Sequence, residues 1–416
     1  MSYNETASVA AARRSFKSDS PLAISASSIA PSNLPRQVYC ILGLPIDAIE
    51  LPDLVRLIDA AAADRSRFLV STPNLNFLTS SLSDTEFRES VLDSDACPPD
   101  GKPIIWIARL LGLPIRKRAA GADLLDALSL RKQTERRLTA FLFGGAPGIA
   151  ATAACRLNDR HGDLLCVGTL DPGFCDLAEM STDDVITSVN ESDADFLIVS
   201  LGAKKGQLWL QRNHDRLTIP VRSHLGAAIN FQAGTVKRAP TIFRELGFEW
   251  LWRIKEERVL WRRYRDDGLV FGRLLVTRVL PLLIITQLQR IRSAAEGQLQ
   301  VTRISNDGAV TLRLDGSATE SNVSTVMPLL NEAISTGKDV IINLGGVRYI
   351  DMRFFGLLLM LRKELKLRGC QLSFDQVPGR IKRLFRLNEV GFLLTNEPEG
   401  FAASAPMQAA AGSQAV

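Results

Sequence analysis

The chain has 416 residues, of which 46% are hydrophobic and 23% are charged, and its formal net charge is +5. This is the composition of an ordinary globular protein, and the length allows two domains. We see neither a zinc-finger spacing nor a base-stacking sheet motif, so we expect no nucleic-acid partner. Six cysteines without a C-x-x-C pair, beside three histidines, argue against a zinc site and indicate buried thiols in a reducing cytosol.

The first segment, residues 1–36, is rich in Ser, Ala, Asn and Pro and lacks periodicity. It predicts a disordered tail, and because it has no apolar core segment we expect no signal peptide. The folded region begins at Tyr39–Gly43, and a second disordered tail is predicted for residues 399–416.

Strand-like apolar runs alternate with helical patterns in the next part of the chain. Four such runs have small residues (Gly, Ser or Thr) at their ends and lead into a helical pattern; they span residues 68–72, 140–144, 164–168 and 196–201. This order predicts βαβ units, and therefore an α/β domain with a Rossmann-like parallel sheet. Ligands bind such sheets at the carboxyl ends of the strands.

Two short motifs could carry chemistry, one at the end of the first of these runs and one in a turn further along the chain. Thr72 and Asn74, in Ser71-Thr-Pro-Asn-Leu-Asn76, could hydrogen-bond a sugar or a diphosphate. The alternative interpretation is that this motif only ends a strand and caps the following helix. Asp100 lies in Pro98-Pro-Asp-Gly-Lys-Pro103, a rigid turn that can aim a carboxylate into a cleft. Such a carboxylate can act as a general base, and an ordinary Asp-Gly turn is the alternative interpretation.

Three further segments indicate phosphate or nucleotide binding. Basic residues precede a Gly-x-Asp helix start in the segment with Arg118, Gly121 and Asp123, as at an anion site on a helix N-terminus. Glycine-rich turns follow two of the predicted strands, where backbone N–H groups could approach a nucleotide or could simply form turns. These turns include Gly144, Gly145, Gly202 and Lys204.

A basic and aromatic stretch fills residues 237–265. Guanidinium groups match phosphate oxygens, and Trp and Tyr suit a membrane interface. We expect several of the arginines to contact phosphate and the rest to contact lipid headgroups, with a merely solvated basic face as the alternative. The arginines in question are Arg238, Arg253, Arg258, Arg262 and Arg265.

Residues 267–296 are predicted to form an apolar linker helix. Arg273 and Arg278 interrupt its apolar part, and the longest uncharged piece, Val279–Gln289, is too short to span a bilayer. We expect a helix at the membrane interface or one packed between domains, with a true span as the alternative. Pro281 would kink this helix.

Residues 297–398 form a second predicted α/β unit. A hairpin is expected over 298–305 and 308–316, followed by a helix (321–336), a strand (339–344), a helix (352–368), a strand (371–374) and a helix (380–387).

Taken in order, these motifs resemble the WecG/TagA/CpsF glycosyltransferase family from about Leu42 to Asp266, within a predicted glycosyltransferase domain of residues 37–266. The matching pieces are Thr72-Pro-Asn74, Pro99-Asp-Gly101, Arg118-x-x-Gly-x-Asp123, Phe143-Gly-Gly145, Arg238-Ala-Pro240 and the arginines that follow. The resemblance implies an inverting transferase that needs neither metal nor cofactor. It implies transfer from a UDP-sugar to a saccharide on polyprenyl diphosphate, in the cytoplasm, peripherally on the inner membrane face. By the same resemblance Asp100 is the base, Thr72 faces it, and the arginine-rich appendage closes over the diphosphate.

The second unit resembles a STAS domain, through Val340–Leu344, Val347–Asp351 and Gly356-Leu-Leu. Regulated members of that family carry a phosphorylatable Ser or Thr just after the Asp, where this chain has Met352 and Arg353. The resemblance therefore implies docking to a protein partner or homo-oligomer formation rather than a phosphate switch. Asp351 itself could be only a helix cap.

Two other interpretations stay open. The chain has Lys204-Lys-Gly-Gln207 and Ile229-Asn230 where the resembled family usually shows Pro-x-Gln-Glu and Phe-Asp, so it could be a non-catalytic scaffold whose STAS unit recruits partners. A regulatory STAS protein with a nucleotide-sensing front half is a third possibility. The sequence does not identify the donor sugar, the acceptor sugar, the pathway or the oligomeric state.

Overall fold

The structure is a computed structural model that describes residues 34–395, apart from 132–135, 161, 241–242, 244–246, 257, 259, 293–298 and 306–307. The predicted C-terminal tail lies outside the described residues, and so does the predicted N-terminal tail except for residues 34–36. Leu34 is fully buried, and Arg36 forms an ion pair with Asp47 at 2.6 Å. The fold therefore already includes residues 34–36, which the predicted N-terminal tail had contained.

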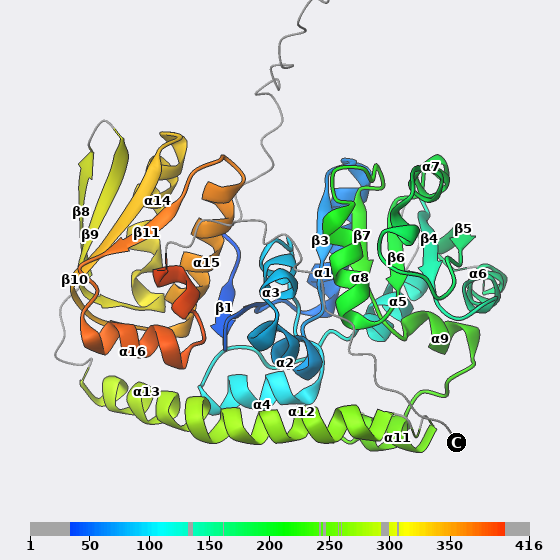
Figure 1. The fold of residues 1–416 in the computed structure, drawn as a ribbon, viewed down its shortest axis with the longest axis horizontal. Coiled ribbons are helices and arrows are strands. Elements are labelled where there is room, and N and C mark those ends of the chain that lie inside the picture. Colours follow the sequence, from blue (N-terminus) through cyan, green and yellow to red (C-terminus); the bar gives the residue numbers. More distant parts are fainter. Residues whose placement is uncertain are drawn as a thin grey trace, which may run out of the picture. The chain divides into compact units, whose positions relative to one another are not determined.

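A parallel sheet organises the N-terminal domain (Figure 1). Within the described residues it has five strands in the order β3-β7-β6-β4-β5, which confirms the predicted α/β class. The strands are β3 (Phe68–Val70), β4 (Leu138–Gly144), β5 (Leu164–Leu170), β6 (Phe196–Ser200) and β7 (Val221–His224).

Strand β7 is the one member of this sheet that the sequence pattern did not predict. It has four residues and carries Arg222, whose side chain is 1% exposed. The guanidinium group is satisfied internally, because it donates to the carbonyl oxygens of His214, Leu217 and Ile219 at 2.7 Å each. Because a charged residue interrupts the apolar run, the sequence pattern does not predict this central strand.

Helices cover both faces of the sheet, as the side-chain alternation of β4 requires. Ala140 and Leu142 face one side, which is covered by α1 (Leu51–Ala63), α5 (Gly121–Leu130), α6 (Ile149–Asp159) and α9 (Ala228–Ala233). Phe141 and Phe143 face the other, which is covered by η1 (Glu179–Ser181), α7 (Asp183–Glu191) and α8 (Ala203–Arg212). On that side the ring of Phe143 stacks on Trp209 with the centroids 4.3 Å apart.

The C-terminal domain has a mixed sheet in the order β11-β10-β9-β8. Its elements are β8 (Gln300–Ser305), β9 (Ala309–Ala318), η4 (Glu320–Asn322), α14 (Val323–Ser335), β10 (Asp339–Ile350), α15 (Met352–Lys366), β11 (Leu372–Asp375), α16 (Gly379–Leu387) and η5 (Gly391–Leu394). The predicted hairpin and the helix and strand order are confirmed. Asp351 caps α15, since its carboxylate accepts the Phe354 N–H at 2.8 Å and the Glu320 N–H at 2.7 Å.

Helix α15 joins the two domains, because the side turned away from its own sheet is covered by the N-terminal hairpin. That hairpin consists of β1 (Val38–Ile41) and β2 (Leu44–Asp47). Arg353 Nη1 donates to the Val38 carbonyl oxygen at 3.2 Å, and Lys363 Nζ lies 2.5 Å from Asp95 Oδ1. One hydrophobic core consequently runs from the hairpin and from α2 (Leu75–Ser83), α3 (Thr85–Leu92) and α4 (Lys102–Leu110) into the C-terminal domain.

A long helix follows the N-terminal domain. It consists of α12 (Leu260–Leu274), a π-helical turn (Leu275–Val279) and α13 (Leu280–Arg292), and α11 (Glu249–Glu256) precedes it. The π turn lies just before Pro281, which cannot donate a backbone hydrogen bond, and the Leu280 N–H reaches back to Leu275. The helix thus starts earlier than the predicted linker at residue 267.

The two sides of this long helix differ. Leu274, Val279 and Leu282 are buried in the core, so the expectation of a packed helix is met on one side. Large apolar side chains are exposed along the other, namely Leu269, Val270, Val276, Leu280, Ile284 and Leu288; we call these six residues the apolar stripe. By length and composition Leu260–Gln289 could cross a membrane, although a long helix of a soluble protein can pass the same test.

All six cysteines are free thiols. Cys40, Cys97 and Cys166 are buried as expected, but Cys155 is exposed, and Cys175 and Cys370 are half-buried. The expectation of buried thiols is therefore wrong for half of them.

Candidate functional site

A cavity of about 820 Å³ opens at the carboxyl edge of the parallel sheet. Residues one or two positions after the ends of four of its strands line it: Thr72 after β3, Gly145 after β4, Gly202 after β6 and Leu225 after β7. This is the edge at which parallel α/β sheets bind ligands, and the volume suits a nucleotide-sized molecule. The N-termini of α5 and α8 also reach the cavity, through Gly121 and Ala203.

Asp100 is held in this cavity by its backbone. Its N–H donates to the Pro73 carbonyl oxygen at 2.8 Å, and the Ala119 N–H donates to the Pro99 carbonyl oxygen at 2.8 Å. These bonds place the Pro99-Asp-Gly101 turn between the loops that carry Thr72 and Arg118. Gly101 has φ +83°, a conformation that favours glycine, and it starts α4 directly after Asp100.

The surroundings of Asp100 tune its acidity. Burial raises the pKa of Asp100 to about 7, and the negative charges of Glu249 and Asp123 act in the same direction. The positive charge of Arg118 and a hydrogen bond from the Asn74 side chain oppose this rise in pKa. A carboxyl group with a pKa near neutrality is suited to take up a proton during a reaction.

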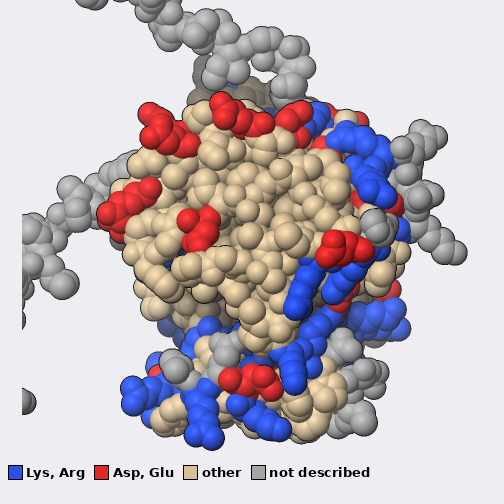
Figure 2. Space-filling model, turned by 90° about the vertical axis from the view of Figure 1, so that its right-hand side faces the viewer, with Lys and Arg blue, Asp and Glu red and all other residues tan. Residues whose placement is uncertain are grey.

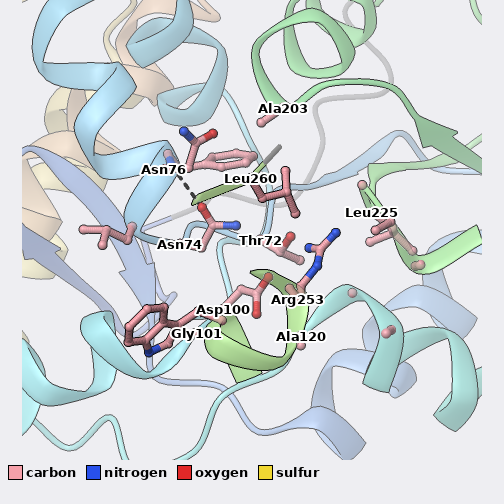
Figure 3. Close-up of a pocket in the computed structure, with 18 of the residues that line it drawn as sticks. Thr72, Asn74, Asn76, Asp100, Gly101, Ala120, Ala203, Leu225, Arg253 and Leu260 are labelled. Atoms are coloured by element: carbon pink, nitrogen blue, oxygen red, sulfur yellow. Dashed lines mark hydrogen bonds between the residues drawn. The ribbon is translucent and has the colours of Figure 1, made fainter. Parts of the chain in front are cut away.

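Asn74 has a second role that is structural. Its side chain accepts the Phe77 N–H at 3.1 Å and so caps α2, as the helix-cap interpretation of this motif expects (Figure 3). Asn74 therefore joins the carboxyl end of β3, the start of α2 and Asp100. Figure 3 shows Thr72, Asp100 and Arg253 turned toward the same space.

Positive charge is in excess around the cavity. Among the described lining residues, six basic side chains (Lys102, Arg118, Lys205, Arg238, Arg253 and Arg263) outnumber three carboxyl side chains (Asp100, Glu249 and Asp267). Arg118 Nη1 pairs with Glu249 at 2.6 Å, and Arg238 pairs with Asp123 and Asp126. An excess of guanidinium and ammonium groups in a cleft attracts anions such as a diphosphate.

Most of the predicted site residues lie together here. The cavity is lined by Thr72, Asn74, Asp100, Arg118, Gly121, Gly145, Gly202, Arg238 and Arg253. Asp123 and Gly144 do not line it, but Asp123 pairs with Arg238, and Gly144 precedes the lining residue Gly145. Gly144 has φ +93°, and a Cβ there would lie 2.7 Å from the Ser200 carbonyl oxygen, so glycine is required for strand packing.

Four predicted residues lie away from the cavity. Lys204 pairs with Asp84, and it is the neighbouring Lys205 that lines the cavity. Arg258, Arg262 and Arg265 are exposed, and Arg265 pairs with Asp266 at 2.7 Å. In Figure 2 lysines and arginines gather at the lower end of the face shown, where α11 and the start of α12 lie in Figure 1.

Several lining residues escaped the sequence analysis. Phe174 is 96% exposed in the loop after β5 and lines the cavity. His224 ends the unpredicted strand β7; its Nε2 lies 2.8 Å from the Leu201 carbonyl oxygen, and burial lowers its pKa. Asn230, which the sequence analysis named only as a departure from the resembled family, also lines the cavity. Its Oδ1 is buried without a hydrogen-bond partner among the described residues, so it could accept a hydrogen bond from a ligand.

The wall opposite the sheet comes from α11 and α12. Trp250, Leu260, Tyr264 and Phe271 give it an apolar and aromatic surface next to Arg253 and Arg263. The cavity is thus polar toward the strands and apolar toward the long helix. Among the residues that the structure describes, we find no cluster of three His, Cys, Asp or Glu side chains placed to hold a metal ion.

Comparison with known proteins identifies relatives of both domains. A Bacillus spizizenii N-acetylglucosaminyldiphosphoundecaprenol N-acetyl-beta-D-mannosaminyltransferase is 25% identical over 217 residues, which are 51% of this chain and 81% of that protein. A Staphylococcus aureus protein of the same name is 23% identical over 216 residues, 51% of this chain and 82% of its own.

The C-terminal domain is similar to the Bacillus cell fate determinant SpoIIAA in its phosphorylated form. That structure is 19% identical with a TM-score of 0.20, and the match covers 24% of this chain and 92% of SpoIIAA.

Family models match both domains. A STAS-domain model (Mlab, STAS domain) matches residues 301–395. The model of the glycosyl transferase WecG/TagA/CpsF family matches residues 39–282, which is more than half of the chain and extends into the long helix. The chain therefore belongs to the glycosyl transferase WecG/TagA/CpsF family and is a glycosyltransferase with a STAS domain.

Proposed function

We propose that the chain transfers a sugar from a UDP-sugar to a saccharide carried on polyprenyl diphosphate, in the synthesis of a bacterial envelope glycan or exopolysaccharide. The relatives named above are N-acetylmannosaminyltransferases that act on N-acetylglucosaminyl-diphospho-undecaprenol. An N-acetylhexosamine donor and an acceptor of that kind are therefore the first substrates to test. The observation that carries the proposal is Asp100, a carboxyl group with a pKa near 7 in a basic cavity at the sheet edge.

Transfer with inversion needs one base and one stabilised leaving group. The acceptor hydroxyl oxygen attacks the anomeric carbon of the donor while the bond from that carbon to the UDP oxygen breaks. The hydroxyl proton goes to the Asp100 carboxylate, and the bonding pair leaves with UDP. Asn74 hydrogen-bonds the carboxylate and so keeps it oriented, and Thr72 lines the same cavity, where it could contact either sugar.

The side-chain cations provide the charge stabilisation that the leaving diphosphate requires. Arg118 lines the cavity from the loop before α5, and Arg253 and Arg263 line it from the wall formed by α11 and α12, so these arginines could contact a diphosphate from two sides. Because these guanidinium groups have permanent positive charge, we propose that the reaction proceeds without a metal ion. A chelator such as EDTA should then leave the rate unchanged.

The long helix fits an acceptor that is anchored in a membrane. Its α12 part forms one wall of the cavity, and the apolar stripe is exposed along the same helix. We propose that the stripe lies in the interfacial region of the cytoplasmic leaflet, where a polyprenyl chain could stay in the bilayer while its diphosphate enters the cavity.

The test is release of UDP by the full chain, with polyprenyl-diphospho-N-acetylglucosamine as acceptor and a panel of UDP-N-acetylhexosamines as donors. Asp100→Asn should lower turnover by about 10²- to 10⁴-fold while UDP binding, measured by calorimetry, persists. Asp159→Asn, an exposed aspartate at the end of α6, is the matched control and should keep full turnover. Normal turnover in Asp100→Asn would refute the role of this base. Failure of the wild type with every donor would instead favour the scaffold interpretation.

A further inference from the structure

A second cavity lies where three parts of the chain meet, outside the proposed sugar-transfer site. It has a volume of about 470 Å³. Arg88 comes to it from α3 of the N-terminal domain, Arg278 from the π turn of the long helix, and Arg383 and Arg386 from α16 of the STAS domain. Four guanidinium groups from three elements therefore converge on one space.

The charges around this cavity are unbalanced. Glu389 is the one carboxylate among the described lining residues, and it pairs with Arg278. Arg88, Arg383 and Arg386 form no ion pair with any residue that the structure describes. Arg383 and Arg386 are three residues apart and so project from the same side of α16, where like charges repel.

The burial of the Arg88 side chain costs free energy. Its side chain is half-buried, its Nε has no hydrogen-bond partner in the described part of the chain, and its guanidinium carbon lies 4.1 Å from the centre of the Phe392 ring. Burial lowers the pKa of Arg88, and the neighbouring charge of Arg362 lowers it further against the pull of Glu89. A bound anion would relieve the repulsion among these positive charges.

We propose that this cavity, which we call the junction site, binds a phosphorylated anion. Guanidinium groups bind phosphate oxygens in pairs of parallel hydrogen bonds, and the junction site offers several such groups around a space larger than one phosphate. A solvated basic face would present its charges along one helix, whereas these come from three elements and surround a hollow. The anion would hold the STAS domain, the long helix and α3 together.

The junction site does not depend on the proposed sugar transfer. None of its lining residues lines the cavity at the sheet edge. Two sources of the same chemistry are possible, a soluble oligophosphate such as a nucleotide or the phosphate of a lipid headgroup. The experiment has to separate the two sources, and it has to separate the junction site from the first cavity, which also attracts anions.

We use hydrogen–deuterium exchange of the full chain, with inorganic tripolyphosphate as probe. This method measures protection peptide by peptide, so it distinguishes the junction site from the first cavity. Tripolyphosphate should slow the exchange of amides in peptides that cover 379–395 and 275–280. In the variant Arg383→Gln with Arg386→Gln, the concentration needed for this protection should rise by about tenfold for each guanidinium removed. Asp100→Asn should leave the protection of 379–395 intact, because that residue belongs to the other cavity.

The control variant removes two charges from the same domain outside the junction site. Lys382→Gln with Arg348→Gln changes exposed residues that do not line it and should keep the wild-type response. If sodium chloride at equal ionic strength gives the same protection, or if the double arginine variant responds like the wild type, the proposal fails.

A second arm uses phosphatidylcholine vesicles with and without phosphatidylglycerol. If only the anionic vesicles protect 379–395, and the double arginine variant loses that protection, the phosphate is a lipid headgroup and the junction site stands. If neither tripolyphosphate nor the vesicles protect this segment, the proposal is wrong.

Discussion

Arg118 Nη1 lies 2.6 Å from Glu249 Oε2, and this ion pair connects α11 to the loop beside Asp100. The two members act on Asp100 in opposite directions, since Glu249 raises the pKa of Asp100 and Arg118 lowers it. The helix that closes one side of the cavity thus helps to set the acidity of the proposed base. A ligand that moves α11 would change both the shape and the chemistry of the site.

The first prediction concerns Glu249→Gln. The substitution removes one charge that raises the pKa of Asp100 and leaves the Arg118 charge without its neutralising partner. The pKa of Asp100 should fall below its wild-type value of about 7, so the carboxylate form persists to lower pH. In the pH profile of kcat/KM for sugar transfer, the acidic limb should move to lower pH.

The ratio of the rates at pH 6 and pH 8 is the informative measurement, because a general loss of activity cancels in it. This ratio should rise in Glu249→Gln. Glu256→Gln neutralises an exposed glutamate on the same helix and should leave the ratio unchanged. An acidic limb displaced to higher pH would show that another group controls the profile.

The second prediction uses Asp100→Asn to test stability. A folded-state pKa near 7 exceeds the value of about 3.9 expected in an unfolded chain, so between these pH values the folded state holds a proton that the unfolded state releases. The stability of the wild type therefore falls as pH rises toward 7, and asparagine removes this loss. The Tm of Asp100→Asn relative to the wild type should be higher at pH 8 than at pH 5. A Tm difference that is the same at both pH values would argue against a raised pKa.

Sequence patterns predicted those parts of the protein whose structure depends on residues close together in the chain. Apolar runs that end in small residues predicted the strands β3 to β6. The polar motif after the first run predicted Thr72 and Asn74, and the Pro- and Gly-flanked turn predicted Asp100; all three residues line one cavity. Strand β7 was missed because the charged residue Arg222 interrupts its apolar run. In the fold this guanidinium group is buried and donates to the carbonyl oxygens of the preceding loop.

Relationships between distant segments were not predictable. Helix α15 is apolar around nearly its whole circumference, which indicates burial but not the identity of what covers it. The covering element is the β1–β2 hairpin, which precedes α15 by some three hundred residues of sequence. Lys204 and Lys205 are neighbours in the sequence, which does not show how α8 is rotated about its own axis. In the structure that rotation turns Lys205 toward the cavity and Lys204 toward Asp84.

The third prediction tests the contact between the two domains. A Cβ atom at Gly356 would lie 2.1 Å from the Val38 carbonyl oxygen, so Gly356→Ala must push α15 away from β1. We expect a loss of about 1–3 kcal/mol in the free energy of unfolding, seen as a lower Tm of the full chain.

Gly272→Ala is the matched control, because that glycine is also inside a helix but a Cβ there meets nothing within 4 Å. The control should be neutral or more stable by about 0.5–1 kcal/mol. Equal effects of the two substitutions would mean that α15 and β1 are not in this close contact.

The fourth prediction concerns the apolar stripe and the membrane. Val276 is 64% exposed and Ile284 is 60% exposed, so replacing both with glutamine should not disturb the core. If the stripe lies in the lipid interface, Val276→Gln with Ile284→Gln should weaken binding to phosphatidylcholine–phosphatidylglycerol vesicles by about tenfold or more, measured by co-sedimentation. Leu130→Gln with Leu367→Gln provides the control, since these leucines are 78% and 67% exposed but lie on α5 and at the end of α15.

The same stripe variant separates membrane binding from catalysis. With a short-chain, water-soluble acceptor, turnover should equal that of the wild type, because the stripe residues replaced do not line the cavity. With the long-chain acceptor in vesicles, turnover should fall in parallel with vesicle binding. A variant that binds vesicles normally would mean that the stripe is covered by protein, and a second copy of the chain would then be the first partner to test by its oligomeric state in solution.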